Sequence, residues 1–555
     1  MHMIERFLPK TEFTSYEDFI ENYELTIPER FNFAYDVMDC WAAERPAQPA
    51  LYWCDDFGNE KEFSFSDVKL YSDKIANMLL SMGIRKGDRV LLILKQRPEV
   101  WFFMLGLHKI GGVCIPATYQ LTRKDIEYRV NAAGIKMICA VDDKEVVEQI
   151  IAARPQCKSL EYVGILGSDI PDGCFSLRDE IDCAGSDFTP PSGADYPCSS
   201  DPMLIYFSSG TTGMPKMILH DFIYPLGHIT TAKYWQRVED GGRHLTVADS
   251  GWAKFGWGKI YGQWICGVAN VAYDTEKFDA KKLLQTMEKL RLTSFCAPPT
   301  VYRFLIKEDL SKYDLSSIQH ASTAGEPLNP EVYNQFMAAT GIPICEGFGQ
   351  SETSVILGNY EWFPAKPGST GKPSPLYDID IVDEEGNPCE DGIVGTIVIK
   401  NIEKKHPAGL FHGYLHDDEA NRKSFIGGAY STGDTAWRDS DGYIWFVGRN
   451  DDVIKCSGYR IGPFEVESAL LTHPSVLECA ITAAPDPVRG QVVKATVVLA
   501  KGYTASDALK KELQTHVKNV TAPYKYPRIV DFVDELPKTL SGKIKRGDLR
   551  KQDEA

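Results

Sequence analysis

Hydrophobic and polar residues alternate in blocks along the first third of the chain. Residues 89–94 form an apolar run with the length of a buried strand, and residues 99–110 form an apolar run long enough for a helix. Further strands are expected over residues 112–116 and 136–141, with a helix over residues 123–132 between them. Strands that alternate with helices predict βαβ units on a largely parallel sheet. Ligands of such sheets bind at the carboxyl ends of the strands.

The pattern changes before and after this region. Residues 1–50 predict an irregular, partly helical lead-in, and residues 378–383 and 392–400 predict a pair of antiparallel strands. Near residue 450 the chain becomes charged, and a helix is expected from Pro463. Because 555 residues exceed what one core usually supports, separate domains are expected. The predicted fold class is α/β: a large N-terminal domain (1–450) of two βα-layered sheets plus a β subdomain, and a small α+β C-terminal domain (451–555).

The amino-acid composition indicates the class of protein and its cellular compartment. An apolar content of 43% and a charged content of 25% are ordinary for a soluble globular protein. No run approaches the roughly 18 uncharged apolar residues of a membrane span, so no membrane span is expected. The 14 cysteines are scattered without a CxxC pair or a metal-like cluster, which predicts reduced thiols. Together with a start that has no apolar signal segment, this predicts a cytoplasmic protein.

The charge distribution excludes one class of partner. A net charge of −17 argues against nucleic acid, which would require a basic face. Residues 451–555 carry 16 Lys/Arg and 14 Asp/Glu, which is a balance of +2 and leaves −19 for the rest. The less acidic C-terminal part suits a module that must approach phosphate groups.

The segment from Tyr206 to Lys216, YFSSGTTGMPK, follows a short apolar strand. Its two glycines allow successive backbone N–H groups to face one anion, and the lysine adds a compact positive charge. The pattern predicts a triphosphate or pyrophosphate clamp, although a polar surface turn is the alternative for such a run. It is not a Walker A loop, because that spacing is absent. The loop residues are Ser208, Ser209, Gly210, Thr211, Thr212 and Gly213.

Three later segments carry further candidate chemistry. Residues 249–264 are rich in aromatic residues and glycine, and could line an apolar pocket or belong to the core. Residues 322–330 predict a strand-to-helix turn with Asn329 as N-cap. Glu352 follows a short strand with hydroxyls beside it, which suits the oxygen ligands of Mg²⁺. Asp434 follows a Ser-Thr-Gly turn and can accept two hydroxyl protons.

These motifs resemble a known family. SSGTTGMPK is similar to the phosphate loop of the AMP-forming adenylating enzymes, the acyl-CoA synthetase superfamily, and residues 298–302 resemble its medium-chain synthetases. At least five motifs occur in the family's order between about residues 30 and 550. The resemblance implies a mobile C-terminal domain that rotates about Asp451 as a hinge.

The resemblance also implies a nucleotide site. Phe348 would stack on adenine, Asp434 would bind the ribose, and Glu352 with Thr212 would hold Mg²⁺; Ser351 replaces the family's usual threonine. The implied catalytic residues are Lys543, Glu352 and Lys216. The full set of implied ATP-binding residues is Ser208, Ser209, Gly210, Thr211, Thr212, Gly213, Lys216, Gly325, Glu326, Pro327, Phe348, Gly349, Gln350, Ser351, Glu352, Asp434, Arg449 and Lys543.

Two further sites follow from the same resemblance. Gly349 would face the acyl group and leave the pocket floor open, where acetate-specific relatives carry an indole. The acyl pocket would comprise Trp252, Lys254, Phe255, Trp257 and Gly349. Coenzyme A would contact Ser457, Gly458, Tyr459, Arg460, Arg489, Tyr524, Lys525 and Tyr526.

The implied reaction converts a small carboxylic acid to its coenzyme A thioester through an acyl-adenylate, with ATP, Mg²⁺ and coenzyme A as cofactors. A short-to-medium aliphatic or branched acid is expected first and a benzoate-like acid second. A homodimer is compatible with this reading. Two alternatives stay open: an enzyme that loads a carrier protein, and a non-catalytic nucleotide sensor.

Overall fold

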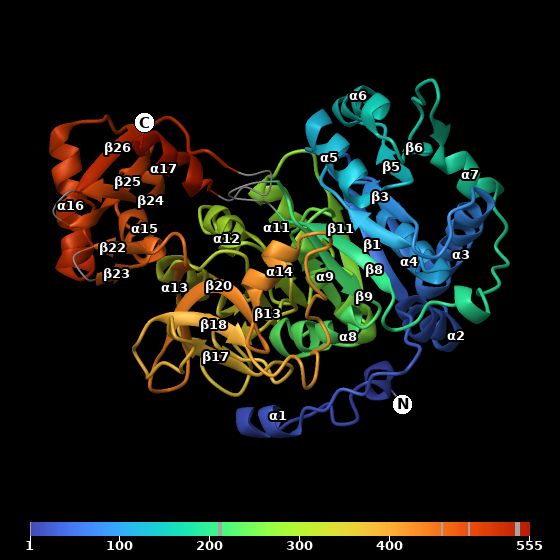
Figure 1. Cartoon of the computed structure of the whole chain (residues 1–555), viewed down its shortest axis with the longest axis horizontal. Coiled ribbons are helices and arrows are strands. Elements are labelled where there is room, and N and C mark those ends of the chain that lie inside the picture. Colours follow the sequence, from blue (N-terminus) through green and yellow to red (C-terminus); the bar gives the residue numbers. More distant parts are fainter. Residues whose placement is uncertain (1, 209–213, 457–458, 487–488, 539–543, 555) are drawn as a thin grey trace.

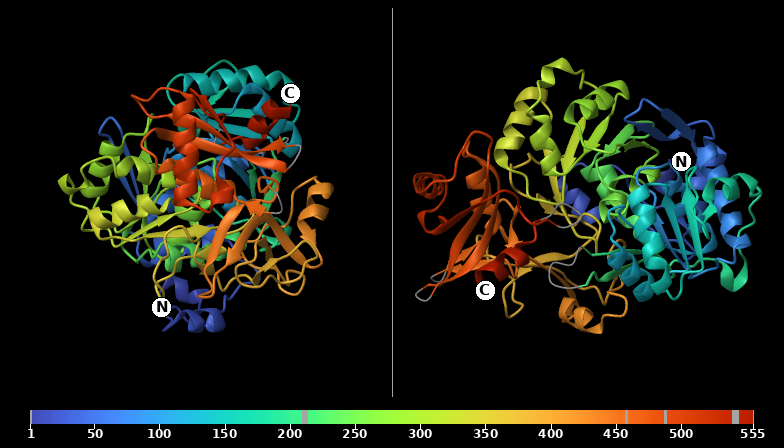
Figure 2. Two further views of the ribbon diagram at one scale, coloured as in Figure 1. Left: turned by 90° about the vertical axis from the view of Figure 1, so that its left-hand side faces the viewer. Right: turned by 90° about the horizontal axis from the view of Figure 1, so that it is seen from above.

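The computed structural model describes residues 2–208, 214–456, 459–486, 489–538 and 544–554. Figure 1 shows a large body built from the blue to orange parts of the chain, with the red C-terminal domain to one side of it. The right-hand view of Figure 2 shows the same separation, and in the left-hand view the C-terminal domain lies in front of the larger body. Asn329, the N-cap of helix α13, donates its side-chain amide to the carbonyl of Ser468 in the C-terminal domain (3.4 Å). The predicted α/β class, with a large N-terminal and a small C-terminal domain, is confirmed.

The first sheet contains the strands predicted from the alternating pattern. Its order is β7-β6-β5-β3-β4-β8-β9, and all neighbours except β8 and β9 are parallel. The central strands are buried on both faces, which explains their continuous apolar runs. The strands are β3 Arg89–Ile93, β4 Val113–Pro116, β5 Met137–Val141, β6 Tyr162–Leu166, β7 Phe175–Ser176, β8 Pro202–Phe207 and β9 Met217–Asp221.

The second sheet combines a parallel centre with antiparallel edges. Its order is β16-β15-β14-β13-β12-β10-β11-β1-β2, with parallel pairing from β14 to β1. The strands are β1 Pro49–Asp55, β2 Glu60–Ser64, β10 Arg243–Thr246, β11 Ala269–Asp274, β12 Ser294–Cys296, β13 His320–Thr323, β14 Ile344–Phe348, β15 Leu357–Gly358 and β16 Lys372–Pro373.

Helices cover both sheets, and their ends follow local sequence signals. The predicted helices over 99–110 and 123–132 are confirmed as α4 and α5, and Asn329 caps α13 by accepting the Glu331 N–H. Helix α4 is buried almost completely, because it packs against α3 within the main core. The helices of the N-terminal domain are α1 Tyr16–Asn22, α2 Cys40–Glu44, α3 Phe65–Ser81, α4 Glu99–Ile110, α5 Arg123–Ala133, α6 Lys144–Ala153, α7 Leu177–Cys183, α8 Tyr224–Ile229, α9 Ala253–Gly258, α10 Tyr261–Ile265, α11 Ala280–Lys289, α12 Pro299–Leu305, α13 Pro330–Thr340 and α14 Asp418–Ser424.

The remaining two sheets are smaller. The predicted β subdomain is antiparallel, with β17 Ile379–Val382, β18 Gly395–Ile399, β19 Phe425–Ile426, β20 Ala429–Arg438 and β21 Ile444–Arg449. The C-terminal domain has its own apolar core around β22 Ile454–Cys456, β23 Tyr459–Ile461, β24 Val476–Asp486, β25 Gly490–Leu499 and β26 Ile529–Val533. Its helices are α15 Pro463–Leu471, α16 Asp507–Val520 and α17 Arg546–Glu554.

Candidate active site

A cavity of about 1390 Å³ lies where the carboxyl ends of both large sheets face the C-terminal domain. Its lining includes residues that directly follow β8, β13 and β14, among them Ser208, Gly325 and Gln350. The β subdomain contributes Asp434 and Arg449. The structure therefore gathers the described nucleotide residues other than Lys216 around one cavity, at the position expected for ligands of parallel sheets.

The two described ends of the predicted phosphate loop are tied together. The N–H of Ser208 donates to the carbonyl of Lys216, and the N–H of Lys216 donates to Oγ of Ser208, both at 2.9 Å. These bonds close the neck of the loop at the carboxyl end of β8. Ser209, Gly210, Thr211, Thr212 and Gly213 lie outside the described residues.

The turn after β13 lies on the cavity wall. Gly325, Glu326 and Pro327 all line the cavity, and Gly325 has a φ of +104°, a conformation that favours glycine. The Glu326 carboxylate accepts a hydrogen bond from Thr300 Oγ1 at 3.4 Å. The predicted turn is thus placed where its backbone can approach a ligand.

The segment after β14 forms the centre of the site. Phe348 is half-buried, and its ring lies 5.8 Å from that of Phe446. The carbonyl of Ser351 contacts Nε2 of His220 at 2.8 Å. The Glu352 carboxylate accepts a hydrogen bond from the Tyr414 hydroxyl at 2.8 Å. An aromatic face and a carboxylate therefore lie in one short segment that lines the cavity.

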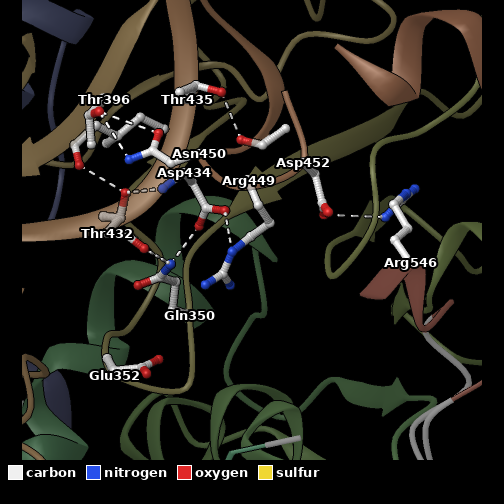
Figure 3. Close-up of polar contacts among 12 residues, drawn as sticks. Gln350, Glu352, Thr396, Thr432, Asp434, Thr435, Arg449, Asn450, Asp452 and Arg546 are labelled. Atoms are coloured by element: carbon white, nitrogen blue, oxygen red, sulfur yellow. Dashed lines mark hydrogen bonds and ion pairs between the residues drawn. The ribbon is translucent and has the colours of Figure 1, made fainter. Parts of the chain in front are cut away.

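Gln350 orients the carboxylate of Asp434 (Figure 3). Its Nε2 donates to Asp434 Oδ2 and, at 2.8 Å, to the Thr432 carbonyl, while its Oε1 accepts from the Tyr430 hydroxyl at 2.7 Å. Asp434 is only 4% exposed, and its Oδ1 lies 3.6 Å from Nε of Arg449. Burial lowers the pKa of Arg449, but the neighbouring carboxylates of Asp434, Asp451 and Glu352 raise it more, so the guanidinium stays charged.

The predicted acyl pocket is only partly present. Trp252 and Gly349 line the cavity, whereas Phe255 packs in the core with its ring 4.8 Å from that of Trp101. A Cβ on Gly349 would lie 2.3 Å from Cη2 of Trp257. The expectation that Gly349 leaves the pocket floor open is therefore wrong, because the Trp257 indole fills that space.

Lys254 does not line this cavity. Its Nζ donates to the carbonyl of Ala324 at 2.9 Å, at the end of β13. The sequence left the direction of this side chain open, and the structure places it against the turn that carries Gly325.

Some of the predicted coenzyme A residues are described by the structure, and others are not. The rings of Tyr459 and Tyr524 stack at 4.1 Å on the surface of the C-terminal domain, and Lys525 pairs with Glu465 beside them. Tyr526 lies beneath Lys518, whose Nζ is 3.9 Å from the ring centroid. Arg489 is exposed, and its N–H donates to Asp486 at 2.8 Å. Ser457, Gly458 and Lys543 lie outside the described residues, and Arg460 belongs to β23.

Sequence reasoning missed three residues of the cavity wall, Tyr414, Asp249 and Lys259, and Tyr430, which contacts a wall residue from behind. Tyr414 contacts Glu352, and Tyr430 contacts Gln350, across 62 and 80 residues of chain. Burial raises the pKa of Asp249 to about 6 and lowers the pKa of Lys259 to about 7. No local motif marks these residues, since their roles depend on neighbours that are distant in sequence. The weak signal was the position of Asp249 at the start of the aromatic segment.

Comparisons with known proteins agree with this geometry. The family described as AMP-binding enzyme matches residues 38–415, and the AMP-binding enzyme C-terminal domain matches residues 465–543. The acyl-coenzyme A synthetase ACSM3 of Mus musculus is 42% identical over 550 residues, covering 98% of this chain and 94% of that protein. The acyl-coenzyme A synthetase ACSM5 of Homo sapiens is 42% identical over 540 residues, covering 95% and 91%.

Solved structures share the fold. The anthranilate CoA ligase AuaEII, in complex with anthranoyl-AMP, has a TM-score of 0.86 at 28% identity, covering 95% of this chain and 98% of its own. The acyl-CoA synthetase of Brucella canis has a TM-score of 0.74 at 32% identity, covering 98% and 99%. The fold and the cavity are those of an adenylate-forming enzyme. The chain belongs to the AMP-binding enzyme family and, through its full-length relatives, to the acyl-coenzyme A synthetases, as the sequence motifs predicted.

The predicted cytoplasmic location is contradicted. The ACSM3 relatives from Mus musculus, Rattus norvegicus, Pongo abelii and Homo sapiens are all named as mitochondrial. All 14 cysteines are described, and none of them forms a disulfide bond. Cysteine usage of this kind cannot distinguish the cytosol from another reducing compartment, so it does not support the predicted location.

A search of the described residues finds no helix that is long and apolar enough to cross a membrane.

Proposed function

We propose that the protein activates a small carboxylic acid with ATP and transfers the acyl group to coenzyme A. The observation that carries this proposal is the shared cavity. It places the end of the phosphate loop, the turn after β13, the segment after β14 and Asp434 around one space, and the C-terminal domain forms one side of it. A nucleotide bound there would have its base, ribose and phosphates contacted by separate parts of the chain.

Each group of residues has a distinct task in this proposal. The ring of Phe348 stacks on the adenine, supported by Phe446 behind it. Asp434 accepts the ribose hydroxyls, since Gln350 holds its carboxylate in place. Lys216 and the backbone amides of its loop bind phosphate oxygens. Arg449 adds a cation near the same carboxylates.

The residues present also fit Mg²⁺. Glu352 lines the cavity, and one of its oxygens accepts the Tyr414 hydroxyl, while the other accepts no hydrogen bond from the described residues. The described part of the chain contains no cluster of three metal-ligating side chains. That agrees with Mg²⁺, which usually takes one or two carboxylates and completes its shell with water and phosphate oxygens. Bound there with Thr212, the ion would neutralise phosphate charge.

The proposed reaction has two steps. An oxygen of the carboxylate attacks the α-phosphorus of ATP, the bond from that phosphorus to the bridging oxygen breaks, and pyrophosphate leaves. In the second step the coenzyme A sulfur attacks the acyl carbon, the thiol proton is released, and AMP leaves. No side chain forms a covalent bond. The protein contributes positioning and positive charge, which is how enzymes usually promote phosphoryl transfer.

Lys543 is proposed to supply positive charge in the first step. It lies outside the described residues, but Lys538 and Ile544 on either side of that gap both line the cavity. This placement supports a conformation in which the C-terminal domain contributes to adenylate formation.

The proposed hinge is bracketed by two anchors (Figure 3). On one side, the N–H of Asn450 donates to the Gly433 carbonyl at 2.9 Å, which ties it to the β subdomain. On the other side, Asp452 forms ion pairs with Arg546 and Arg550 of α17. The Asp451 side chain makes no hydrogen bond or ion pair within the described chain. These contacts support a pivot at Asp451 and a domain boundary between residues 450 and 451.

Coenzyme A is proposed to use the surface of the C-terminal domain. Tyr459, Tyr524 and Lys525 form a small aromatic and cationic patch there, and the other candidate residues Arg489, Arg460 and Tyr526 belong to the same domain. The patch is outside the large cavity. Rotation about Asp451 would be needed to bring it to the acyl-adenylate, which is why the hinge belongs to the proposal.

The acid is proposed to be short to medium in length, aliphatic or branched. The Trp257 indole closes the described wall near Gly349, which favours acids at the short end of a range of about four to eight carbons. Each methylene that the pocket does bury would contribute roughly 0.8 kcal/mol to binding. A compact aromatic acid is the second candidate, since the structural relative AuaEII is an anthranilate ligase.

The test is a pyrophosphate-release assay over a panel of carboxylic acids, with and without coenzyme A. We expect acid-dependent pyrophosphate release, and a thioester only when coenzyme A is present. The Lys543→Ala variant should slow adenylate formation by about 10²–10³-fold and spare thioester formation from supplied acyl-adenylate. Release without thioester would favour a carrier-loading enzyme, and nucleotide binding without release would favour a sensor.

A further inference from the structure

Tyr414 lies between two residues of opposite charge in the candidate site. Its hydroxyl donates to Oε1 of Glu352 at 2.8 Å. Its ring faces Lys216, whose Nζ is 4.7 Å from the ring centroid. Both charged residues belong to the described chain, and they form no ion pair with each other. The tyrosine therefore contacts each of them by a different part of its side chain.

The backbone around Tyr414 is fixed to the elements that carry those charges. Phe411 donates its N–H to the carbonyl of Glu352 at 2.8 Å, and Leu415 donates its N–H to the carbonyl of Met217, the first residue of β9, also at 2.8 Å. The side chain of Tyr414 is buried, at 7% exposure. The two backbone hydrogen bonds fix the chain on either side of Tyr414, and the ring itself is held by its burial and by its hydroxyl contact with Glu352.

The position of Tyr414 affects how the charges of Lys216 and Glu352 interact. Lys216 and Glu352 contact the same tyrosine, and opposite charges so placed attract each other. A direct ion pair would neutralise the charges that phosphate and a cation need. An aromatic face attracts an ammonium group without neutralising it. A hydroxyl donor likewise leaves the carboxylate charged. Burial, followed by the charge of Glu352, raises the pKa of the Tyr414 phenol, which keeps it a donor.

We propose that Tyr414 is a positioning residue that keeps Lys216 and Glu352 apart, so that both stay available to the triphosphate of ATP. This inference rests on the proposed phosphate role of Lys216. It adds a residue whose proposed task is to position two other side chains.

The experiment is a double-mutant cycle on ATP affinity, measured by titration calorimetry with the full-length protein. In the wild-type background, Lys216→Met should weaken ATP binding roughly tenfold, which is typical of losing one charged contact. In the Tyr414→Leu background, Glu352 should form an ion pair with Lys216, so Tyr414→Leu alone should weaken ATP binding. Adding Lys216→Met to that variant should then weaken ATP binding by less than about threefold more. Equal losses in both backgrounds would overturn the spacer role.

Two further variants separate this role from a loss of stability. Tyr414→Phe keeps the ring, so the penalty of Lys216→Met should stay near the wild-type value; a penalty that vanishes in this background would contradict the role of the ring. Adding Glu352→Gln to Tyr414→Leu removes the charge that pairs with Lys216, so the loss of ATP affinity caused by Lys216→Met should return to about its wild-type size.

Thermal unfolding of each variant shows whether it is folded. If Tyr414→Leu does not fold, the comparison between the wild-type and Tyr414→Phe backgrounds still tests the role of the ring. No effect of Lys216→Met in the wild type would instead refute the proposed phosphate role, and this inference with it.

Discussion

Gln350 shows how a single side-chain amide can define the orientation of a buried carboxylate. Its Nε2 is committed to Asp434 and to the Thr432 carbonyl, and its Oε1 is committed to Tyr430. The amide can therefore take only one of its two orientations. Because Asp434 is 4% exposed, its charge depends on such donors and on Arg449.

Gln350→Glu should weaken ATP binding by about tenfold or more, because it replaces a donor with a second carboxylate beside Asp434 and leaves acceptors facing each other. The loss should be larger at pH 8 than at pH 6, where the added carboxyl group is more often protonated. Titration calorimetry at both pH values measures this. Gln350→Met is the matched control, since it removes the donor without adding charge; equal affinities of the two variants would contradict the electrostatic explanation.

In the proposed acyl pocket, Trp257 is the residue expected to set the depth. Its indole occupies the space beside Gly349, and its Nε1 donates to the Thr353 carbonyl at 3.1 Å. Trp257→Ala should shift the preference to acids that are two or three methylenes longer, by roughly one or two orders of magnitude in kcat/KM. The variant is expected to lose about 3–5 kcal/mol of stability, so circular dichroism must first show that it is folded.

An unchanged acid preference in a folded Trp257→Ala variant would show that the acyl group lies elsewhere in the cavity. Trp252→Ala is the comparison, because Trp252 lines the cavity but supplies none of the three atoms nearest to a Cβ on Gly349. It should alter the Michaelis constant for the acid without opening the space behind Gly349. A tryptophan at position 349 would overlap the Trp257 indole, so Gly349→Trp could fold only if Trp257 moves.

At the scale of elements, the segment 411–415 joins β9 to the segment after β14. His412 contributes a side-chain contact to this junction: its Nε2 lies 2.7 Å from Oδ2 of Asp221, the last residue of β9. The hydrogen bond to Asp221 raises the pKa of His412, and the ring of His406, whose own pKa burial lowers, stacks on it at 4.4 Å.

This pair should make stability depend on pH. The folded pKa of His412 lies above its ordinary value of 6.5, so its contribution is fully present below about pH 6.5 and is lost as the pH rises through the folded value. His412→Gln should therefore lower the free energy of unfolding more at pH 6 than at pH 9. Urea unfolding at both values measures this, with Asp221→Asn as the matched partner variant. A difference that is constant over pH would exclude the ion pair as its cause.

The sequence predicts an element well when the residues that determine it lie within the element itself. Helix α4 and strand β3 are continuous apolar runs, and the cap of α13 is a local Asn-Pro signal, so the sequence was sufficient. The two-residue strands β15 and β16 pair with their neighbours β14 and β15, but they are too short for any periodicity to mark them.

The same distinction holds within the site. The segments that carry Gly325 and Phe348 are contiguous motifs, and the cavity contains both of them as predicted. The filling of the space beside Gly349 depends on the packing of Trp257 against Trp235, with ring centroids 6.3 Å apart, and a sequence without coordinates cannot give that geometry. The contact of Tyr414 with Glu352 is missing from any local pattern for the same reason.

At the scale of the whole molecule, the cavity is bounded by both domains. Arg546 and Lys538 of the C-terminal domain line it together with Glu352 of the N-terminal domain. The chain between the domains is held by a short turn in which the N–H groups of Asp452 and Val453 donate to the Arg449 carbonyl at 3.0 and 3.1 Å. A rotation about Asp451 would have to break these two bonds, while the anchors at Asn450 and Asp452 can move intact with their own domains.

Asp451→Pro should separate the two half-reactions. Proline fixes φ and removes an N–H, but the Asp451 N–H donates no backbone hydrogen bond within the described chain, so this conformation loses none. Because Lys538 and Ile544 already line the cavity here, adenylate formation should stay within about threefold of wild type, and thioester formation should fall by roughly tenfold or more when the domain cannot rotate. Single-turnover assays with acid plus ATP, and with supplied acyl-adenylate plus coenzyme A, measure the two rates. Asp451→Ala is the control, since it removes the carboxylate and keeps the rotation. Wild-type rates in both half-reactions of the proline variant would place the pivot elsewhere, and equal losses in both would mean that the conformation described here is not the adenylate-forming one.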